Sequence, residues 1–394
     1  MVTSPRGIPC RTTSDVPRPL SPEYFQRNQT VDLLRGLAIL MVLVLHAVVM
    51  TPDIAAHPWL TTIANQLGAG VQMFFLLSGF VIAAAFERGL ARGEGTWGFL
   101  WRRAAKMLPL YFIFLHANIG FYFLANAAFE HPEFFRNSVS ATNLTWLNYG
   151  LHLLLLQGLV PTLIHTLQDG SWSIVCEVYF YIAFPLLIHR FTRTASHALM
   201  AFAGSLAFAV AFTMLLGRFK GAYGYYAFPA QLPCFLLGVY CHRLSIAWPD
   251  LELSGAHKIT FAVTLVFLFF GFAKAQTAPL GIHILYTVMF ALVLTLVRIC
   301  SKSLLSEVLR SFGRQSYALF LVHLLLLKVV YTLLVTKNPQ LGLPLVLALN
   351  LSVSVALSWL LSWAVFNRID IWCVDRVSQR LQRRSASAQI LQAS

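Results

Sequence analysis

Charged residues are scarce in this sequence, and acidic residues are the scarcest. Only 11% of the 394 residues are charged, against about 25% in an ordinary soluble domain, while 58% are hydrophobic. This balance excludes a disordered chain, a coiled coil and a soluble globular domain, and it predicts an integral membrane protein. The 29 Lys and Arg outnumber the 15 Asp and Glu. In a membrane protein that excess reports orientation, so no nucleic acid is expected as a partner.

Closely spaced cysteines are also absent. The 6 cysteines are scattered without a Cys-x-x-Cys pair or a metal-ligand spacing, which excludes a disulfide framework and gives no reason to expect a metal. The N-terminus lacks the apolar core of a signal peptide, because residues 1–30 are polar and rich in Pro, Ser and Thr. We expect residues 1–30 to form a disordered cytosolic tail.

Long apolar runs fill most of the remaining chain. Because about 20 residues cross a bilayer core, these runs predict about ten transmembrane helices. They lie at 31–50, 68–86, 107–129, 172–188, 195–216, 226–241, 259–273, 280–297, 315–336 and 343–366. An eleventh run, 147–160, is short and contains polar and aromatic residues, which favours an interfacial or re-entrant helix.

The basic residues decide the orientation of these helices. With ten helices and both termini in the cytosol, most Lys and Arg fall in cytosolic segments, whereas an eleventh helix would move the later basic loops outside. We therefore expect an all-α bundle, multi-pass in the cytoplasmic (inner) membrane and surrounded by membrane lipid. Its multi-span domain covers 31–366 with an extracytoplasmic loop at 130–171, and a basic cytosolic tail covers 367–394. No appended soluble domain is expected.

The first span carries two ionisable residues, Arg35 and His46. Eleven residues at about 1.5 Å each put them roughly 16 Å apart along a helix axis, with Arg35 at the cytosolic rim and His46 near mid-membrane. This spacing fits a long ligand with an anionic end at the rim and a reactive end inside. From the residues alone a second interpretation is equally open, in which Arg35 anchors the helix end and His46 makes one interhelical hydrogen bond.

Four more charged residues belong to or flank the predicted spans. Glu177 stands in an apolar run, where a carboxylate needs a partner from a neighbouring helix. Arg102, Arg103 and Lys106 form a basic segment that is either an ordinary cytosolic flank or a site for phosphate groups.

Several uncharged or weakly basic residues in the spans have a structural interpretation of their own. Ser78 and Gly79 are small and permit close helix approach. His323, taken alone, favours a hydrogen bond between helices. Trp172 fits either the aromatic belt at the membrane interface or a platform on which a sugar stacks.

Five motifs, taken in order, resemble those of the membrane acyltransferase-3 family. The first span resembles the family pattern of Arg, ten residues, then His. The five segments are 31–46, 74–80, 102–111, 172–185 and 313–323. Lys106 stands where the family carries a second Arg. The lysine keeps the positive charge but cannot bind a phosphate in the bidentate way that an arginine does.

The resemblance implies a membrane O-acyltransferase. Such an enzyme moves an acyl group, commonly acetyl, from cytosolic acyl-CoA to a hydroxyl of a glycan, a lipid-linked sugar or a similar acceptor, as in the O-acetylation of polysaccharides. Under this resemblance Arg35, Arg103 and Lys106 bind the donor acetyl-CoA, and His46 and Glu177 are catalytic, with Glu177 orienting the imidazole. Further candidates are Ser78 and Ser173, as donors to the developing oxyanion, and Trp172 and His323. A separate extracytoplasmic transferase is a further expected partner.

Three alternatives stay open at this point. His46 acts either as a general base or as an acylated nucleophile. The chain as a whole could instead be a multi-span transporter or exporter of a glycan or lipid-linked sugar, with His and Glu as a proton relay. An intermediate hypothesis is an acyl-conveying subunit that passes the group to a separate transferase.

Overall fold

The regular structure of the chain is entirely helical wherever the computed structural model describes it, namely residues 22–51, 57–128, 139–140, 142–220, 223–272, 279–297, 303–338 and 340–393. The α-helices are α1 (Pro22–Val49), α2 (Pro58–Leu67), α3 (Ala69–Ala91), α4 (Thr96–Ala128), α5 (Trp146–Leu153), α6 (Ser171–Ala183), α7 (His189–Phe191), α8 (Ala195–Lys220), α9 (Tyr223–Tyr226), α10 (Phe228–Ala247), α11 (Gly255–Phe272), α12 (Pro279–Leu296), α13 (Leu304–Arg314), α14 (Ser316–Lys337), α15 (Leu343–Leu361) and α16 (Asn367–Ala393). The 3-10 turn η3 (Gln157–Leu159) and the π-helical turns η4 (Phe184–Ile188) and η5 (Ser362–Phe366) join them. The expected all-α fold is confirmed.

Seven helical segments among the described residues are long and apolar enough to cross a membrane. They are Gln29–Val49, Pro58–Ala91, Thr96–Ala127, Ser171–Phe191, Ala195–Leu216, Ser316–Thr336 and Leu343–Leu381. Two shorter apolar helices cover His257–Val266 and His283–Leu296. The count of ten spans and the cytosolic placement of the termini stay predictions.

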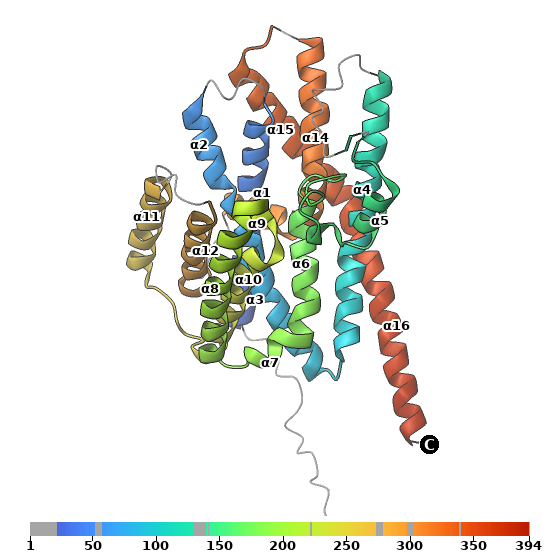
Figure 1. The fold of residues 1–394 in the computed structure, drawn as a ribbon. Helices are drawn as coiled ribbons and strands as arrows, with labels where there is room; N and C mark the ends of the chain where they lie inside the picture. Colours follow the sequence, from blue (N-terminus) through green and yellow to red (C-terminus); the bar gives the residue numbers. More distant parts are fainter. Residues whose placement is uncertain are drawn as a thin grey trace, which may run out of the picture.

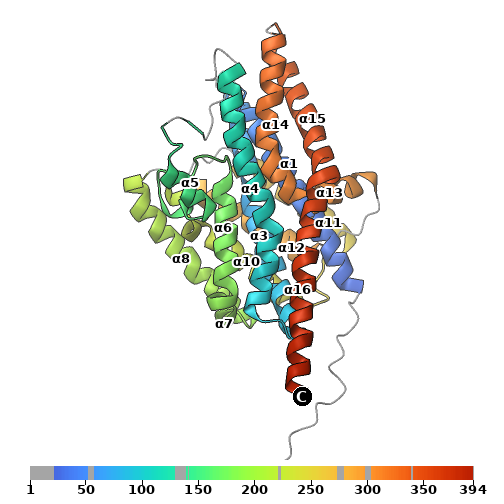
Figure 2. The same cartoon turned by 90° about the vertical axis from the view of Figure 1, so that its right-hand side faces the viewer.

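The helices run broadly along one axis, with α3 inside the bundle (Figure 1). α3 packs against α1, α10 and α12, and nearly all of its residues from Ala69 to Phe86 are buried. A helix that is apolar on every side is expected in such a position. The beginning of α1 and the end of α16 lie at the same end of the bundle, the lower one in both views (Figure 1, Figure 2).

Three predicted segment boundaries differ from the structure. Residues 22–30, expected in a disordered tail, are the first turns of α1, while 1–21 lie outside the described residues. In place of one helix over 147–160, the structure has α5 and the η3 turn, and neither is long enough to cross a membrane. The expected basic tail continues the bundle as α16, which packs along α4.

Candidate active site

A cavity of about 350 Å³ lies among α1, α3, α4, α6, α14 and α16. This volume is in the range of small-molecule sites. Most of the residues singled out in the sequence line it, although they come from different helices: Arg35, Ser78, Arg103, Lys106, Ser173 and Glu177. The fold therefore brings together in one place residues that are far apart along the chain.

Positive side chains gather on one part of this cavity. Arg35, Arg103 and Lys106 are joined there by Arg314, the last residue of α13. The guanidinium of Arg103 lies 5.4 Å from the ring centre of Phe99, and its buried Nε has no hydrogen-bond partner among the described residues. A buried N–H donor without a partner is rare and costly, so the cluster is prepared for an anionic ligand.

Glu177 is held by two hydroxyl groups. Its Oε1 accepts hydrogen bonds from Ser78 Oγ and from the phenol of Tyr181, each at 2.5 Å. The carboxylate therefore has partners on α3 and on its own helix, and among the described residues no hydrogen bond joins it to His46. The predicted oxyanion donors are also occupied, because Ser78 donates to Glu177 and Ser173 Oγ donates to the Gly170 carbonyl at 2.9 Å.

The predicted histidines meet each other outside the cavity lining. His323 Nε2 lies 3.1 Å from His46 Nδ1, and the two ring centres are 5.1 Å apart. His323 is fully buried, with no exposed surface. Sequence reasoning placed both residues at membrane depth but did not predict that they pair.

The hydrogen bonds of this pair fix where its protons lie. His323 Nδ1 is 3.1 Å from the Leu319 carbonyl, an acceptor only, so Nδ1 carries the ring proton of a neutral His323. His323 Nε2 must then accept, and His46 Nδ1 donates to it. The free nitrogen of His46 is consequently Nε2, which bears a lone pair and is available as a base or a nucleophile.

Two phenylalanines of the cavity lining contact each other, and one of them also contacts His323. Phe74 and Phe320 both line the cavity, and their rings meet edge to face with centres 6.3 Å apart. The Phe320 ring also contacts the His323 ring, with centres 5.6 Å apart. Phe320 thus lines the cavity and also contacts His323.

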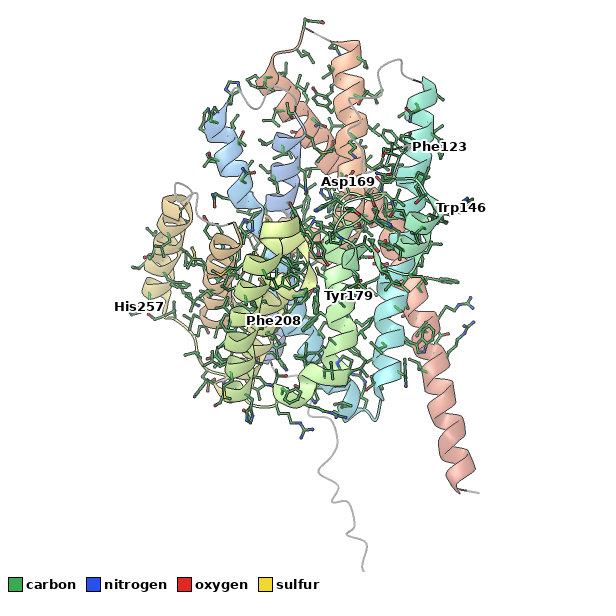
Figure 3. The ribbon with its side chains drawn as sticks, in the orientation of Figure 1. Phe123, Trp146, Asp169, Tyr179, Phe208 and His257 are labelled. Atoms are coloured by element: carbon green, nitrogen blue, oxygen red, sulfur yellow. The ribbon has the colours of Figure 1, made fainter. Side chains whose placement is uncertain are left out.

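A buried ion pair lies near the histidine pair and was not predicted. Lys328 Nζ on α14 donates to Asp169 Oδ2, and the Lys328 side chain is only 5% exposed. Figure 3 labels Asp169 in the segment that leads into α6. Burial lowers the pKa of nearby His165, and the Asp169 carboxylate opposes that shift. Lys328 lies within a candidate membrane span, and an ionisable residue in a span marks a functional region by default.

Breaking this ion pair should destabilise the protein. Lys328→Met leaves the Asp169 carboxylate without its cation, and we expect a loss of about 3 kcal/mol in the free energy of unfolding. Adding Asp169→Asn removes the orphan charge and should recover most of that loss. Thermal unfolding in detergent measures both. A double variant as unstable as Lys328→Met would contradict an electrostatic cause.

Trp172 does not offer an open face for stacking. It is 8% exposed, and its ring packs edge-on against Phe75 and Tyr226, with centres 5.9 and 4.8 Å away. The sugar-platform interpretation therefore has no support from this geometry. Sequence reasoning also missed Arg314 and the α16 carboxylates Asp370 and Asp375, which line the cavity. The basic and acidic residues around position 370 carried no signal beyond that of a charged tail.

Comparisons with known proteins agree with the motifs. Residues 28–363 match the family model of the acyltransferase domain of the acyltransferase-3 family. "Acyltransferase MdmB" of Streptomyces mycarofaciens is 38% identical over 120 residues, which are 29% of this chain. The match spans 27% of that relative's length, about a quarter. No solved structure matches the chain.

Proposed function

Because the chain belongs to the membrane acyltransferase-3 family, we propose that it is an O-acyltransferase that uses acyl-CoA, with acetyl-CoA as its donor. The acceptor is a hydroxyl of a glycan, a lipid-linked sugar or a similar molecule. One observation carries the proposal: α1 presents Arg35 to a cavity that four basic side chains line, and it presents His46 to an imidazole pair. Eleven residues are about three helical turns, so the two side chains share one face of α1.

The cationic end of the cavity suits the phosphates of CoA. Arg35, Arg103, Lys106 and Arg314 supply the positive charges, and Arg103 adds an N–H that has no other partner among the described residues. One guanidinium group can donate two parallel hydrogen bonds to two oxygens of a phosphate. The flexible pantetheine arm then follows α1 over roughly 16 Å toward His46. We assign the cationic end to the cytosolic side of the inner membrane and the acceptor to the opposite side.

His46 Nε2 performs the proton transfer. It takes the proton of the acceptor hydroxyl while the hydroxyl oxygen attacks the thioester carbonyl carbon, and the tetrahedral intermediate then expels sulfur. The C–S bond breaks, a C–O bond has formed, and the proton passes from His46 to the CoA thiolate. His323 accepts from Nδ1 of His46 throughout and so keeps Nε2 directed at the reactants.

A second route uses the same nitrogen. Nε2 attacks the thioester, CoA leaves, and the acyl-imidazole then passes its acyl group to the hydroxyl, which releases its proton. Incubation with acetyl-CoA and labelled CoA, without acceptor, separates the routes. Label enters acetyl-CoA only if an acyl-enzyme forms. The same acyl-enzyme would permit handover to a separate extracytoplasmic transferase.

The proposed function is tested with radiolabelled acetyl-CoA. The purified protein in lipid nanodiscs is mixed with membranes of the native cells, and label in extractable glycan or lipid is measured. Transfer that depends on the protein supports the proposal. If no label is transferred, and the same protein in vesicles exports a glycan that carries no label, the transporter hypothesis is favoured instead.

Arg103 and Arg102 form a matched pair for the donor site. Arg103 lines the cavity, whereas its neighbour Arg102 pairs with Glu94 outside the lining. Hydrogen bonds to charged groups contribute about 1.5–3 kcal/mol, so we expect Arg103→Gln to raise the KM for acetyl-CoA about 10–100-fold. Arg102→Gln should change it less than about threefold, since Arg102 is not part of the described cavity lining. Equal effects of the two substitutions would contradict the assignment of the cavity.

A further inference from the structure

The helix α16 supplies one wall of the cavity. Asp370, Ile371, Val374 and Asp375 line it, and all four lie beyond residue 363, where the match to the family model ends. Asp370 Oδ1 is buried and has no hydrogen-bond partner among the described residues. A buried acceptor without a donor is costly, so this oxygen is prepared for an N–H or O–H group of a ligand.

The packing of α16 along α4 gives the depth of Asp370. The two helices lie side by side and run in opposite directions (Figure 2). The ring centres of Phe366 and Phe114 are 4.8 Å apart, and Leu381 Cδ1 lies 3.8 Å from the position of a Cβ at Gly98. Asp370 is one turn after Phe366, so it lies level with the turn of α4 that precedes Phe114.

The basic side chains and the histidine pair lie on opposite sides of that level. Lys106 is a further turn toward the start of α4, about 6 Å away at 1.5 Å per residue. Tyr317 Oη donates to the Met107 carbonyl at 2.7 Å, which places the beginning of α14 beside this part of α4. Both helices run upward in Figure 2, and His323 is about 9 Å beyond Tyr317 along α14. Asp370 therefore lies between the basic cluster and the histidine pair along the bundle.

We propose that Asp370 accepts a hydrogen bond from the pantetheine arm of the donor and so positions the thioester at His46. The inference rests on the proposed function and adds the part of CoA that α16 binds. The phosphates are negatively charged and are repelled by a carboxylate, so they bind at Arg35, Arg103 and Lys106. The arm that links them to the sulfur is uncharged and carries amide N–H groups and a hydroxyl, from which a carboxylate accepts strong hydrogen bonds.

The neighbours of Asp370 on α16 favour this role. Ile371 and Val374 line the same wall and supply apolar contacts for the methylene and methyl groups of the arm. A hydrogen bond is also stronger where apolar groups exclude water. A contact at the middle of a flexible arm restricts the positions that the thioester can take, which favours its reaction at His46 Nε2.

The alternative is that Asp370 acts only through Lys106. The two charges interact across the cavity, so the carboxylate would hold the ammonium group where it meets the phosphates. The two roles have different requirements. Binding of the arm requires an acceptor oxygen and does not need the phosphates, whereas a role through Lys106 requires the negative charge of Asp370 and the phosphates of the donor.

The test compares acetyl-CoA with S-acetylpantetheine, which has the arm but neither phosphates nor nucleoside. The full-length protein is used in nanodiscs with membranes of the native cells as acceptor. Asp370→Leu removes the oxygen and the charge, whereas Asp370→Asn removes the charge and keeps an acceptor oxygen. We expect Asp370→Leu to lower kcat/KM about 10–100-fold with either donor, and Asp370→Asn to lower it less than about fivefold. Rates are expressed per monodisperse protein, and Asp370→Ala replaces the leucine variant if that variant does not fold.

Arg376→Leu provides a matched control on the same helix. The Arg376 guanidinium lies over the Trp372 ring, 5.1 Å from its centre, and neither residue belongs to the described cavity lining. This substitution also exchanges a charged side chain for leucine, and it should change kcat/KM less than about twofold with either donor. Losses as large as those of Asp370→Leu would trace the effect to α16 as a whole and overturn the inference.

The remaining outcomes separate this inference from the function on which it rests. An unchanged rate in Asp370→Leu, a loss that disappears with S-acetylpantetheine, or an equal loss in Asp370→Asn overturns the inference and leaves acyl transfer standing. If S-acetylpantetheine is too weak a donor to measure, the comparison of the two variants with acetyl-CoA decides, because both remove the same charge. A wild type that transfers acetyl from neither donor overturns the proposed function and the inference with it.

Discussion

Replacement of His46 by alanine is expected to lower acyl transfer by about a thousandfold or more while the protein stays folded and membrane-inserted. The reason is that His46 Nε2 is the free ring nitrogen of the pair, since Nδ1 is engaged with His323. A positioned general base contributes about 10²–10⁴ in rate, and the loss is complete if Nε2 is the nucleophile. Donor binding should survive, because His46 is not part of the described cavity lining.

Transfer of label from acetyl-CoA, measured as kcat and KM, checks this prediction. His116→Ala is the control, because His116 is also a helix histidine with a partner, Tyr149 at 2.8 Å, but it lies outside the described cavity lining. We expect the KM of the His46 variant for acetyl-CoA to change less than about threefold. More than a tenth of wild-type kcat in His46→Ala would exclude both roles assigned to Nε2.

The residues of the proposed donor site could be predicted because their sequence signals are local. The helical period puts Arg35 and His46 on one face, and the basic segment around Arg103 and Lys106 stands out in an otherwise apolar sequence. The resemblance to the acyltransferase-3 family implies that both belong to one donor site. The structure confirms that Arg35, Arg103 and Lys106 line one cavity, while their binding of acetyl-CoA stays a prediction.

The partners of the remaining residues were not predictable in this way. Asp169 and Lys328 are 159 residues apart, and nothing in either local pattern indicates the other. Glu177 was expected to have a partner on a neighbouring helix, and the crossing of α3 and α6 supplies the Ser78 hydroxyl, which no local pattern indicated. Such contacts depend on how helices cross, which apolar runs do not encode.

Fewer of the described helices qualify as spans by length and hydropathy than the ten predicted, and the count of ten stays a prediction. The predicted span at 226–241 belongs to α10, which contains Gln231, Pro233, His242 and Arg243, and it is not among the seven apolar helices. These polar residues face partners inside the bundle: His242 and Arg243, for example, both contact Glu87 of α3. His242 and Arg243 follow the apolar run at 226–241 and lower the hydropathy of α10 as a whole.

Three glycines in the family-like motifs pack helix against helix. A methyl group at Gly79 would overlap the Phe235 carbonyl of α10, and one at Gly313 would overlap the Asp32 carbonyl of α1. At the same crossing of α1 and α13, a methyl group at Gly36 would overlap the Leu309 carbonyl of α13. Each of the three glycines is next to a cavity residue, Ser78, Arg314 or Arg35, so the close crossings also fix the positions of the site.

The combined variant Gly79→Ala, Gly313→Ala is therefore expected to yield no folded protein. Each added methyl group meets backbone, which cannot rotate away, so two helices must separate along their contact at a cost of about 3 kcal/mol or more. The two crossings involve different helices, so the costs should add. Their sum reaches the whole free energy of unfolding of a typical domain, about 5–15 kcal/mol.

Glycines in open positions supply the control for this experiment. Gly120 on α4 and Gly204 on α8 have nothing within 4 Å of an added Cβ, and alanine there should favour the helix by up to about 1 kcal/mol. The control is the double variant Gly120→Ala, Gly204→Ala. It is compared with the Gly79→Ala, Gly313→Ala variant by size-exclusion chromatography and by thermal unfolding in detergent. Both double variants carry the same chemical change, two Gly→Ala substitutions, so they differ only in the space around the added methyl groups. A Gly79→Ala, Gly313→Ala protein that is monodisperse and as stable as the wild type would show that the helices can separate. The fixed geometry that holds Arg35, Ser78 and Arg314 around one cavity would then have to come from contacts other than these crossings.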